Sequence, residues 1–143
     1  MPNDCWNKIE IASGEESIKS IYNNEIKPIL DYHSDNRITR MCKRGIILKT
    51  WTPNQPDYKF LEDLLEKYKE VHIKNIWTEE GGYGGAWVGS YDYKKGETKI
   101  QNFKWDELCI EGYNHHYSEE VTETELKIKY FPIIYYICYV LNI

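Results

Sequence analysis

The stretch that decides the fold is residues 49–93, which read KTWTPNQPDYKFLEDLLEKYKEVHIKNIWTEEGGYGGAWVGSYDY. Pro53 and Pro56 bracket a turn, because proline fixes φ and cannot donate to a sheet ladder. Asp57 is a suitable N-cap for the helix that follows. Four side chains then recur at the spacing of one helix face: Leu61, Leu64, Leu65 and Tyr68. The stretch therefore predicts strand, turn, amphipathic helix, strand, glycine hairpin and strand.

The rest of the chain extends this α+β pattern. Alternating or β-rich segments predict strands at residues 6–12, 45–52, 71–78, 86–93 and 98–103. A first helix should begin at Ser13, whose spacing to Glu16 fits a capping box, and should end near Pro28. We expect residues 31–44 to form a polar loop and residues 105–108 a short helical turn.

The GGYGG segment joins two of these strands. If the hairpin is symmetric about Gly82, Trp77 lies opposite Trp87, and Asn75 lies opposite Gly89. A cross-strand aromatic pair would stabilise the hairpin by up to about 1 kcal/mol and would fix its register. A phosphate-binding loop would instead need glycines that open a helix, so we interpret the glycines as a turn.

The bulk properties are those of one folded domain over residues 1–143, with a core at about 3–110 and a C-terminal extension at 111–143. The net charge is −5, which argues against a duplex-binding protein. The N-terminal residues lack an apolar segment, so we expect no signal peptide, free thiols on the four cysteines and a cytoplasmic location. The longest apolar run, residues 130–143, is too short to span a membrane, which takes about 20 residues.

The segment from residue 126 begins as an alternating strand pattern and becomes apolar on both faces. Such a segment is typical of a central strand or of a contact between subunits, and an extra C-terminal helix is the third alternative.

Several positions together resemble the Api92-like family of small viral and bacterial proteins. The resemblance covers roughly residues 3–110 and depends on these residues: Asn7, Trp51, Pro53, Leu61, Leu64, Tyr68, Trp77, Glu79, Glu80, Gly82, Gly85 and Gly89. It implies a ferredoxin-like two-layer sandwich, with two helices on one face of a mixed or antiparallel sheet of about five strands. It also implies a large DNA virus as the source, and hence the host cytoplasm or the virion as the location. None of these residues forms a catalytic motif.

The sequence offers few candidates for catalytic or metal-binding residues. Neighbouring strand residues point to opposite faces, so Glu79 and Glu80 should not converge on one bond. The donor-rich segment Cys109, Glu111, His115 and His116 lacks the paired spacing of a structural zinc site. We therefore expect no catalytic residue, no metal and no cofactor, and an enzyme is the less favoured alternative.

Binding residues are easier to nominate. An aromatic set on the sheet could stack bases or sugars: Trp51, Trp77, Trp87 and Tyr91. One basic cluster lies in the expected loop: Arg37, Arg40, Lys43 and Arg44. Our first hypothesis is a non-enzymatic interaction domain that binds itself or another protein through an exposed aromatic sheet face. The alternative is a single-stranded nucleic-acid or small-ligand binding module that uses the aromatic face and the basic cluster. No membrane partner is expected.

Overall fold

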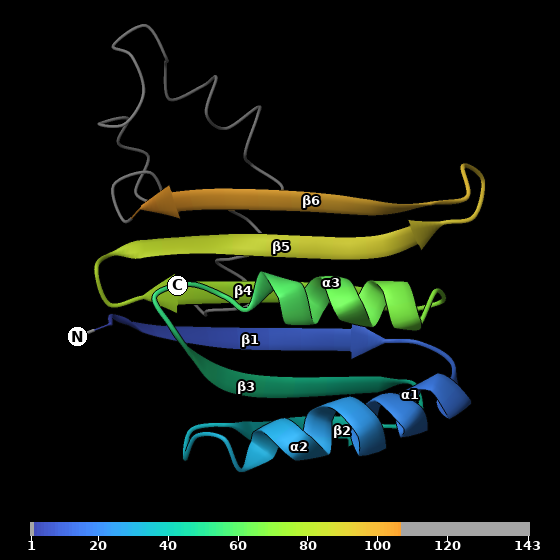
Figure 1. The fold of residues 1–143 in the computed structure, drawn as a ribbon, viewed down its shortest axis with the longest axis horizontal. Helices are drawn as coiled ribbons and strands as arrows, with labels where there is room; N and C mark the ends of the chain where they lie inside the picture. The colour runs from blue at the N-terminus through green and yellow to red at the C-terminus, as the bar shows by residue number, and fades with distance from the viewer. Residues whose placement is uncertain (1, 107–143) are drawn as a thin grey trace, which may run out of the picture.

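The computed structural model describes residues 2–106, which form an antiparallel sheet of six strands with all helices on one face (Figure 1). The elements follow the chain as β1 (Asp4–Ala12), α1 (Glu15–Ile21), a π-helical turn η1 (Tyr22–Ile26), α2 (Lys27–Leu30), β2 (Arg37–Cys42), β3 (Gly45–Pro53), α3 (Tyr58–Lys67), β4 (His72–Glu79), β5 (Tyr83–Asp92) and β6 (Glu97–Asp106). Their order across the sheet is β2-β3-β1-β4-β5-β6, and every neighbouring pair is antiparallel. The α+β class is confirmed, and the sheet has one strand more than we expected.

The unexpected strand is β2, which lies within the segment that we expected to be a loop. It pairs with β3 from Arg37 opposite Lys49 to Cys42 opposite Gly45, with a register shift between Ile38 and Arg40. Five of its six residues are exposed, because β2 forms one edge of the sheet. An edge strand with so little burial has no alternation of apolar and polar residues to reveal it.

The first helix begins later than the capping-box spacing predicted. Gly14 occupies the N-cap position without a side-chain bond, and the buried Ser13 instead donates its hydroxyl to the Glu70 carbonyl at 3.5 Å. The capping box is therefore wrong. Pro28 lies in the short α2 just after the π-helical turn, and the helical segment ends at Leu30. A proline ring clashes with the carbonyl four residues before it in a regular α-helix, and a π-helical turn alters that bonding locally.

The start of α3 agrees with the sequence. The Asp57 side chain accepts a hydrogen bond from the Phe60 backbone N–H at 3.1 Å. The apolar face of α3 packs on the sheet, and thirteen buried residues form the core between the layers: Ile9, Ile11, Ile18, Ile21, Ile26, Ile46, Leu48, Leu61, Leu64, Leu65, Val71, Ile73 and Trp87. Because side chains alternate along a strand, Ile9 and Ile11 assign the odd-numbered residues of β1 to the face that the helices cover. The even-numbered residues of β1 belong to the other face, which we call the second face.

The hairpin between β4 and β5 has a different centre from the expected one. Trp77 pairs with Gly85, and Trp87 pairs with Asn75, so the turn is centred one residue earlier and the two tryptophans are not opposite each other. Gly82 has φ 89°, which a glycine adopts at little cost. The turn interpretation of GGYGG is therefore confirmed, while the tryptophan pair is wrong.

Both tryptophans lie on the helix-covered face, each beside a glycine. A Cβ built on Gly85 would lie 2.5 Å from Trp77 Nε1, and one built on Gly89 would lie 2.6 Å from Trp87 Cη2. The glycines at these two positions therefore make room for the indole rings against the sheet.

Several expectations fall at or beyond the end of the described residues. Trp105 and Asp106 belong to β6 and not to a helical turn. The metal-donor candidates Cys109, Glu111, His115 and His116, the extension at 111–143 and the apolar segment from residue 126 lie outside residues 2–106. Within residues 2–106, no helix is long and apolar enough to cross a membrane.

Candidate functional site

The second face of the sheet carries a row of three basic side chains on adjacent strands. Lys8 of β1 pairs with Lys49 of β3, which pairs in turn with Arg37 of β2. Paired residues of an antiparallel sheet share a face, and neighbouring strands are about 4.8 Å apart. The register therefore aligns three cations across the sheet, which we call the basic row.

An exposed tryptophan borders this row. Trp6 is two residues before Lys8 on β1, so its side chain lies on the same face, and it is 42% exposed. Its cross-strand partner Trp51 is held in place, because its indole N–H donates to Asp4 Oδ1 at 2.8 Å and its ring stacks on His33 with centroids 4.5 Å apart. Trp6 therefore has ring surface free for stacking beside the basic row.

A shallow hollow of about 490 Å³ joins these residues. It is lined by Trp6, Asn7, Lys8, Asp35, Arg37, Lys49, Thr50, Ile76 and Thr78. Lys8 lies 4.0 Å from Glu10, whereas neither Lys49 nor Arg37 forms an ion pair with another residue of the described chain. The hollow therefore retains positive charge despite the net charge of −5.

The exposed part of this face is bounded. On β4 and β5, Ile76 and Ala86 belong to the second face by register but are each only 4% exposed. On the other side, Arg40 pairs with Ile47 and continues the basic character into the next row. Ile76 and Ala86 continue the row of Lys8 onto β4 and β5, so at the level of the basic row the accessible surface lies over β1, β3 and β2.

The structure separates the aromatic residues that the sequence grouped. Trp77 and Trp87 are 2% and 1% exposed on the helix-covered face, so they are not part of an exposed platform. Their positions share the strand face of Ile73, which fixes them toward the core. Tyr91 is half-buried on that same face, edge-to-face with Tyr93 at 4.9 Å. Only Trp51 lies beside the basic row, with its ring already stacked.

Only two of the four residues of the predicted basic cluster lie beside the basic row. Arg37 and Arg40 lie on β2 beside the row, whereas Lys43 and Arg44 form the exposed turn between β2 and β3. Trp6, Lys8 and Lys49 were not nominated from the sequence. The alternation along residues 6–12 was the available signal, since it assigns Trp6 and Lys8 to one face opposite the isoleucines.

Among residues 2–106, the acidic and cysteine side chains considered for chemistry are buried or stand apart from the row. Glu79 is buried at the hairpin and accepts hydrogen bonds from Gly81 N at 3.0 Å and from the Asn3 side chain, while Glu80 is exposed. Burial raises the pKa of the Cys5 thiol to about 11, which leaves it protonated and unreactive at neutral pH. Within residues 2–106, no cluster of histidine, cysteine and acidic residues could hold a metal ion.

Comparison of the chain with models of protein families, with curated proteins and with solved structures gave no match. The fold and the geometry of the site are therefore the basis for a functional argument.

Proposed function

We propose that this protein binds single-stranded nucleic acid on the second face of its sheet, over β1, β3 and β2. The observation that carries the proposal is the exposed Trp6 beside the basic row of Lys8, Lys49 and Arg37. Base stacking on an aromatic side chain supplies affinity without sequence preference, and basic side chains contact the backbone phosphates.

The surroundings of the row favour a single strand over a duplex. The exposed surface is a sheet face with the exposed Trp6 ring and a shallow hollow, and stacking requires bases that are unpaired. The net charge of −5 offers no general attraction for a duplex. We therefore expect binding that depends on a few local contacts and that weakens with salt.

Fluorescence anisotropy of a labelled oligothymidylate, titrated with the protein at several salt concentrations, tests this proposal. With three phosphate contacts, log K should fall against log salt with a slope of about −2, since each contact to a single strand contributes about −0.7. Trp6→Ala should weaken binding by roughly fivefold or more, because one stacked base is worth about 1–3 kcal/mol. Binding that is absent at about 50 mM salt would refute the proposal.

The interaction hypothesis stays a second prediction, with Trp6 in place of the buried tryptophans as its exposed aromatic residue. If this face binds a second copy of the chain, light scattering should show a dimer that Trp6→Ala converts to a monomer. A monomeric protein at high concentration would remove self-association and leave oligonucleotide binding to be judged by its own titration.

We also propose that the fold is a ferredoxin-like sandwich extended by the β5–β6 hairpin. The first four strands are joined as β-α-β-β-α-β and lie in the order β2-β3-β1-β4, which supports the assignment. Membership of the Api92-like family and a large DNA virus as the source remain predictions from the sequence. A structure of a family member with the same strand order would support the assignment.

A further inference from the structure

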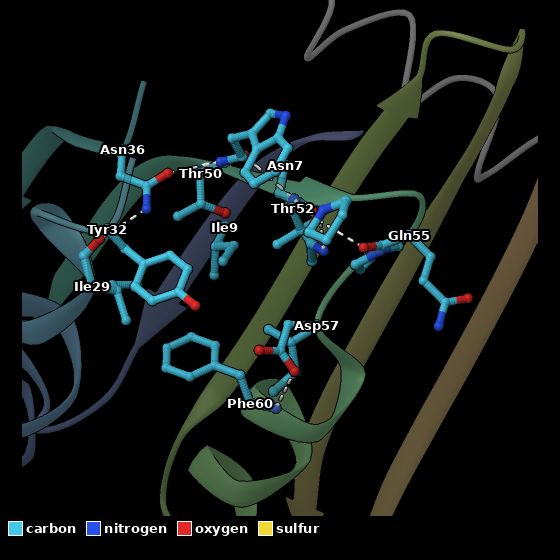
Figure 2. Close-up of a pocket in the computed structure, with 15 residues that line it drawn as sticks. Asn7, Ile9, Ile29, Tyr32, Asn36, Thr50, Thr52, Gln55, Asp57 and Phe60 are labelled. Atoms are coloured by element: carbon cyan, nitrogen blue, oxygen red, sulfur yellow. Dashed lines mark hydrogen bonds between the residues drawn. The ribbon is translucent and has the colours of Figure 1, made fainter. Parts of the chain in front are cut away.

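A second cavity lies on the helix-covered face, between the end of α2 and the start of α3. Its volume is about 640 Å³, which is within the usual range for small-molecule pockets. Figure 2 shows its labelled lining residues: Asn7, Ile9, Ile29, Tyr32, Asn36, Thr50, Thr52, Gln55, Asp57 and Phe60. The helix side is largely apolar and aromatic, while the sheet side carries amides and hydroxyls.

The wall of the cavity on the sheet side includes a buried hydrogen-bond acceptor that has no partner among the described residues. Asn75 lines the cavity and is 1% exposed, and its Oδ1 accepts no hydrogen bond within the described part of the chain. Leaving a buried acceptor unpaired costs about 1–3 kcal/mol, so native proteins rarely do so. An unpaired Oδ1 at the wall of a cavity is therefore a position where a ligand donor would be stabilising.

A chain of hydrogen bonds fixes which atom of Asn75 is left over. The Thr52 hydroxyl donates to the Gln55 carbonyl at 2.8 Å, so it accepts from Asn7 Nδ2 at 2.8 Å. Asn7 Oδ1 is then the acceptor for Asn75 Nδ2 at 3.0 Å. Because a hydroxyl has a single proton, the direction of the whole chain is set, and it leaves Asn75 Oδ1 facing no donor.

The rim of the cavity is fixed by another asparagine. Asn36 Nδ2 donates to the Ile29 carbonyl at 2.8 Å, and its Oδ1 accepts from the Trp51 backbone N–H at 2.8 Å. These two bonds join the end of α2 to β3. The backbone at the rim is therefore held in place by hydrogen bonds, and the cavity needs no large rearrangement to receive a ligand.

The charge of the lining selects the class of ligand. Among the described residues, no lysine, arginine or histidine lines the cavity, and the one charged residue there, Asp57, accepts a hydrogen bond from Phe60 N as the cap of α3. An anion would find no counter-charge here and would face a carboxylate. A neutral ring with one donor matches the apolar walls and the free acceptor.

We propose that this cavity binds an uncharged, ring-containing small molecule that donates an N–H or O–H group to Asn75 Oδ1. Asn7 and Thr50 border both hollows, but the two sites use different groups on opposite faces of the sheet: Asn75 belongs to the helix-covered face and Lys8 to the second face. The two proposals can therefore fail independently.

Three probes that share a benzene ring and a carboxyl-derived group test the class: benzamide, methyl benzoate and benzoate, titrated into the isotope-labelled protein and followed by two-dimensional NMR. Benzamide should shift the side-chain amide signals of Asn7 and Asn75 and should bind roughly fivefold to a hundredfold more tightly than methyl benzoate, which has no donor. Benzoate should bind most weakly. Equal affinity for benzamide and methyl benzoate, or tighter binding of benzoate, would overturn the proposal.

Two variants and a matched control locate the site. Asn75→Ser keeps a hydroxyl that can donate to Asn7 Oδ1 and removes the free carbonyl, so it should abolish the preference for benzamide. Ile29→Trp fills the cavity from its wall and should abolish binding of both neutral probes. Asn24→Ser, on the exposed side of η1, should leave binding unchanged. Retention of the preference in Asn75→Ser, or of benzamide binding in Ile29→Trp, would also overturn the proposal.

Discussion

Substitution of Gly85 by alanine is the sharpest test of how the hairpin packs. The new Cβ would lie 2.5 Å from the Phe103 carbonyl oxygen of β6 and 2.5 Å from Trp77 Nε1. Both distances are shorter than any normal contact of a Cβ, and one of the two atoms belongs to the backbone of the neighbouring strand. Trp77 is only 2% exposed, so its indole ring is enclosed by neighbouring atoms.

The expected cost follows from this overlap. Overpacking a closed core costs about 1–3 kcal/mol, and a clash with backbone belongs at the upper end, so we expect Gly85→Ala to lose about 3 kcal/mol of unfolding free energy. Gly45→Ala is the matched control, because its Cβ would lie 3.4 Å from the Ile11 carbonyl and 3.6 Å from Cys42 Sγ. There we expect no loss, or a gain of up to about 1 kcal/mol from the reduced entropy of the unfolded chain.

Urea unfolding followed by far-UV circular dichroism measures both variants, with the slope m checked for constancy. The double variant Gly85→Ala/Trp77→Phe separates the two clashes, since a smaller ring relieves the contact with the indole but not the contact with Phe103. A Gly85→Ala protein within about 0.5 kcal/mol of the parent would refute the packing of Trp77 over Gly85.

Two further predictions test the burial of Cys5 and the cap of α3. Since burial raises the pKa of Cys5 to about 11 from 9.0, its thiolate fraction at pH 8 should be about 100-fold below that of an ordinary thiol. Peptide mapping after brief iodoacetamide treatment should therefore show Cys5 modified far more slowly than the exposed Cys42, and equal rates would contradict its burial. Asp57→Ala should lose about 1 kcal/mol of unfolding free energy because Phe60 N loses its acceptor, whereas Asp57→Asn should retain most of it; equal losses in both would argue against a capping role.

The spacing of apolar residues predicted the strands and helices that have one continuously buried side. The isoleucines of β1 and the leucines of α3 repeat at the strand and helix periods because each element has one buried side. The edge strand β2 was missed because an edge position leaves it almost wholly exposed. The hairpin register was wrong because the glycine-rich segment fits more than one centre, and shifting the centre by one residue moves every cross-strand partner by two.

The candidate site residues could likewise be predicted only where the face of each strand position could be read from the sequence. Trp77 and Trp87 were expected on an exposed face although their strand positions share the parity of the buried Ile73. Asn7 and Asn75 stand at core-facing positions between apolar neighbours, which was a sequence signal for a buried polar network. The basic row could not be found from the sequence alone, since it joins residues of three strands whose register only the fold supplies.

The central claim is that the basic row on the second face binds single-stranded nucleic acid, and one matched pair of variants tests it most directly. Lys49→Glu reverses a charge within the row, whereas Lys27→Glu makes the same change in α2, among the helices on the opposite side of the sheet (Figure 1). In an oligothymidylate titration at about 50 mM salt, we predict that Lys49→Glu binds about tenfold or more weakly than the parent and that Lys27→Glu binds like the parent. Equal affinities for the two variants would contradict the claim.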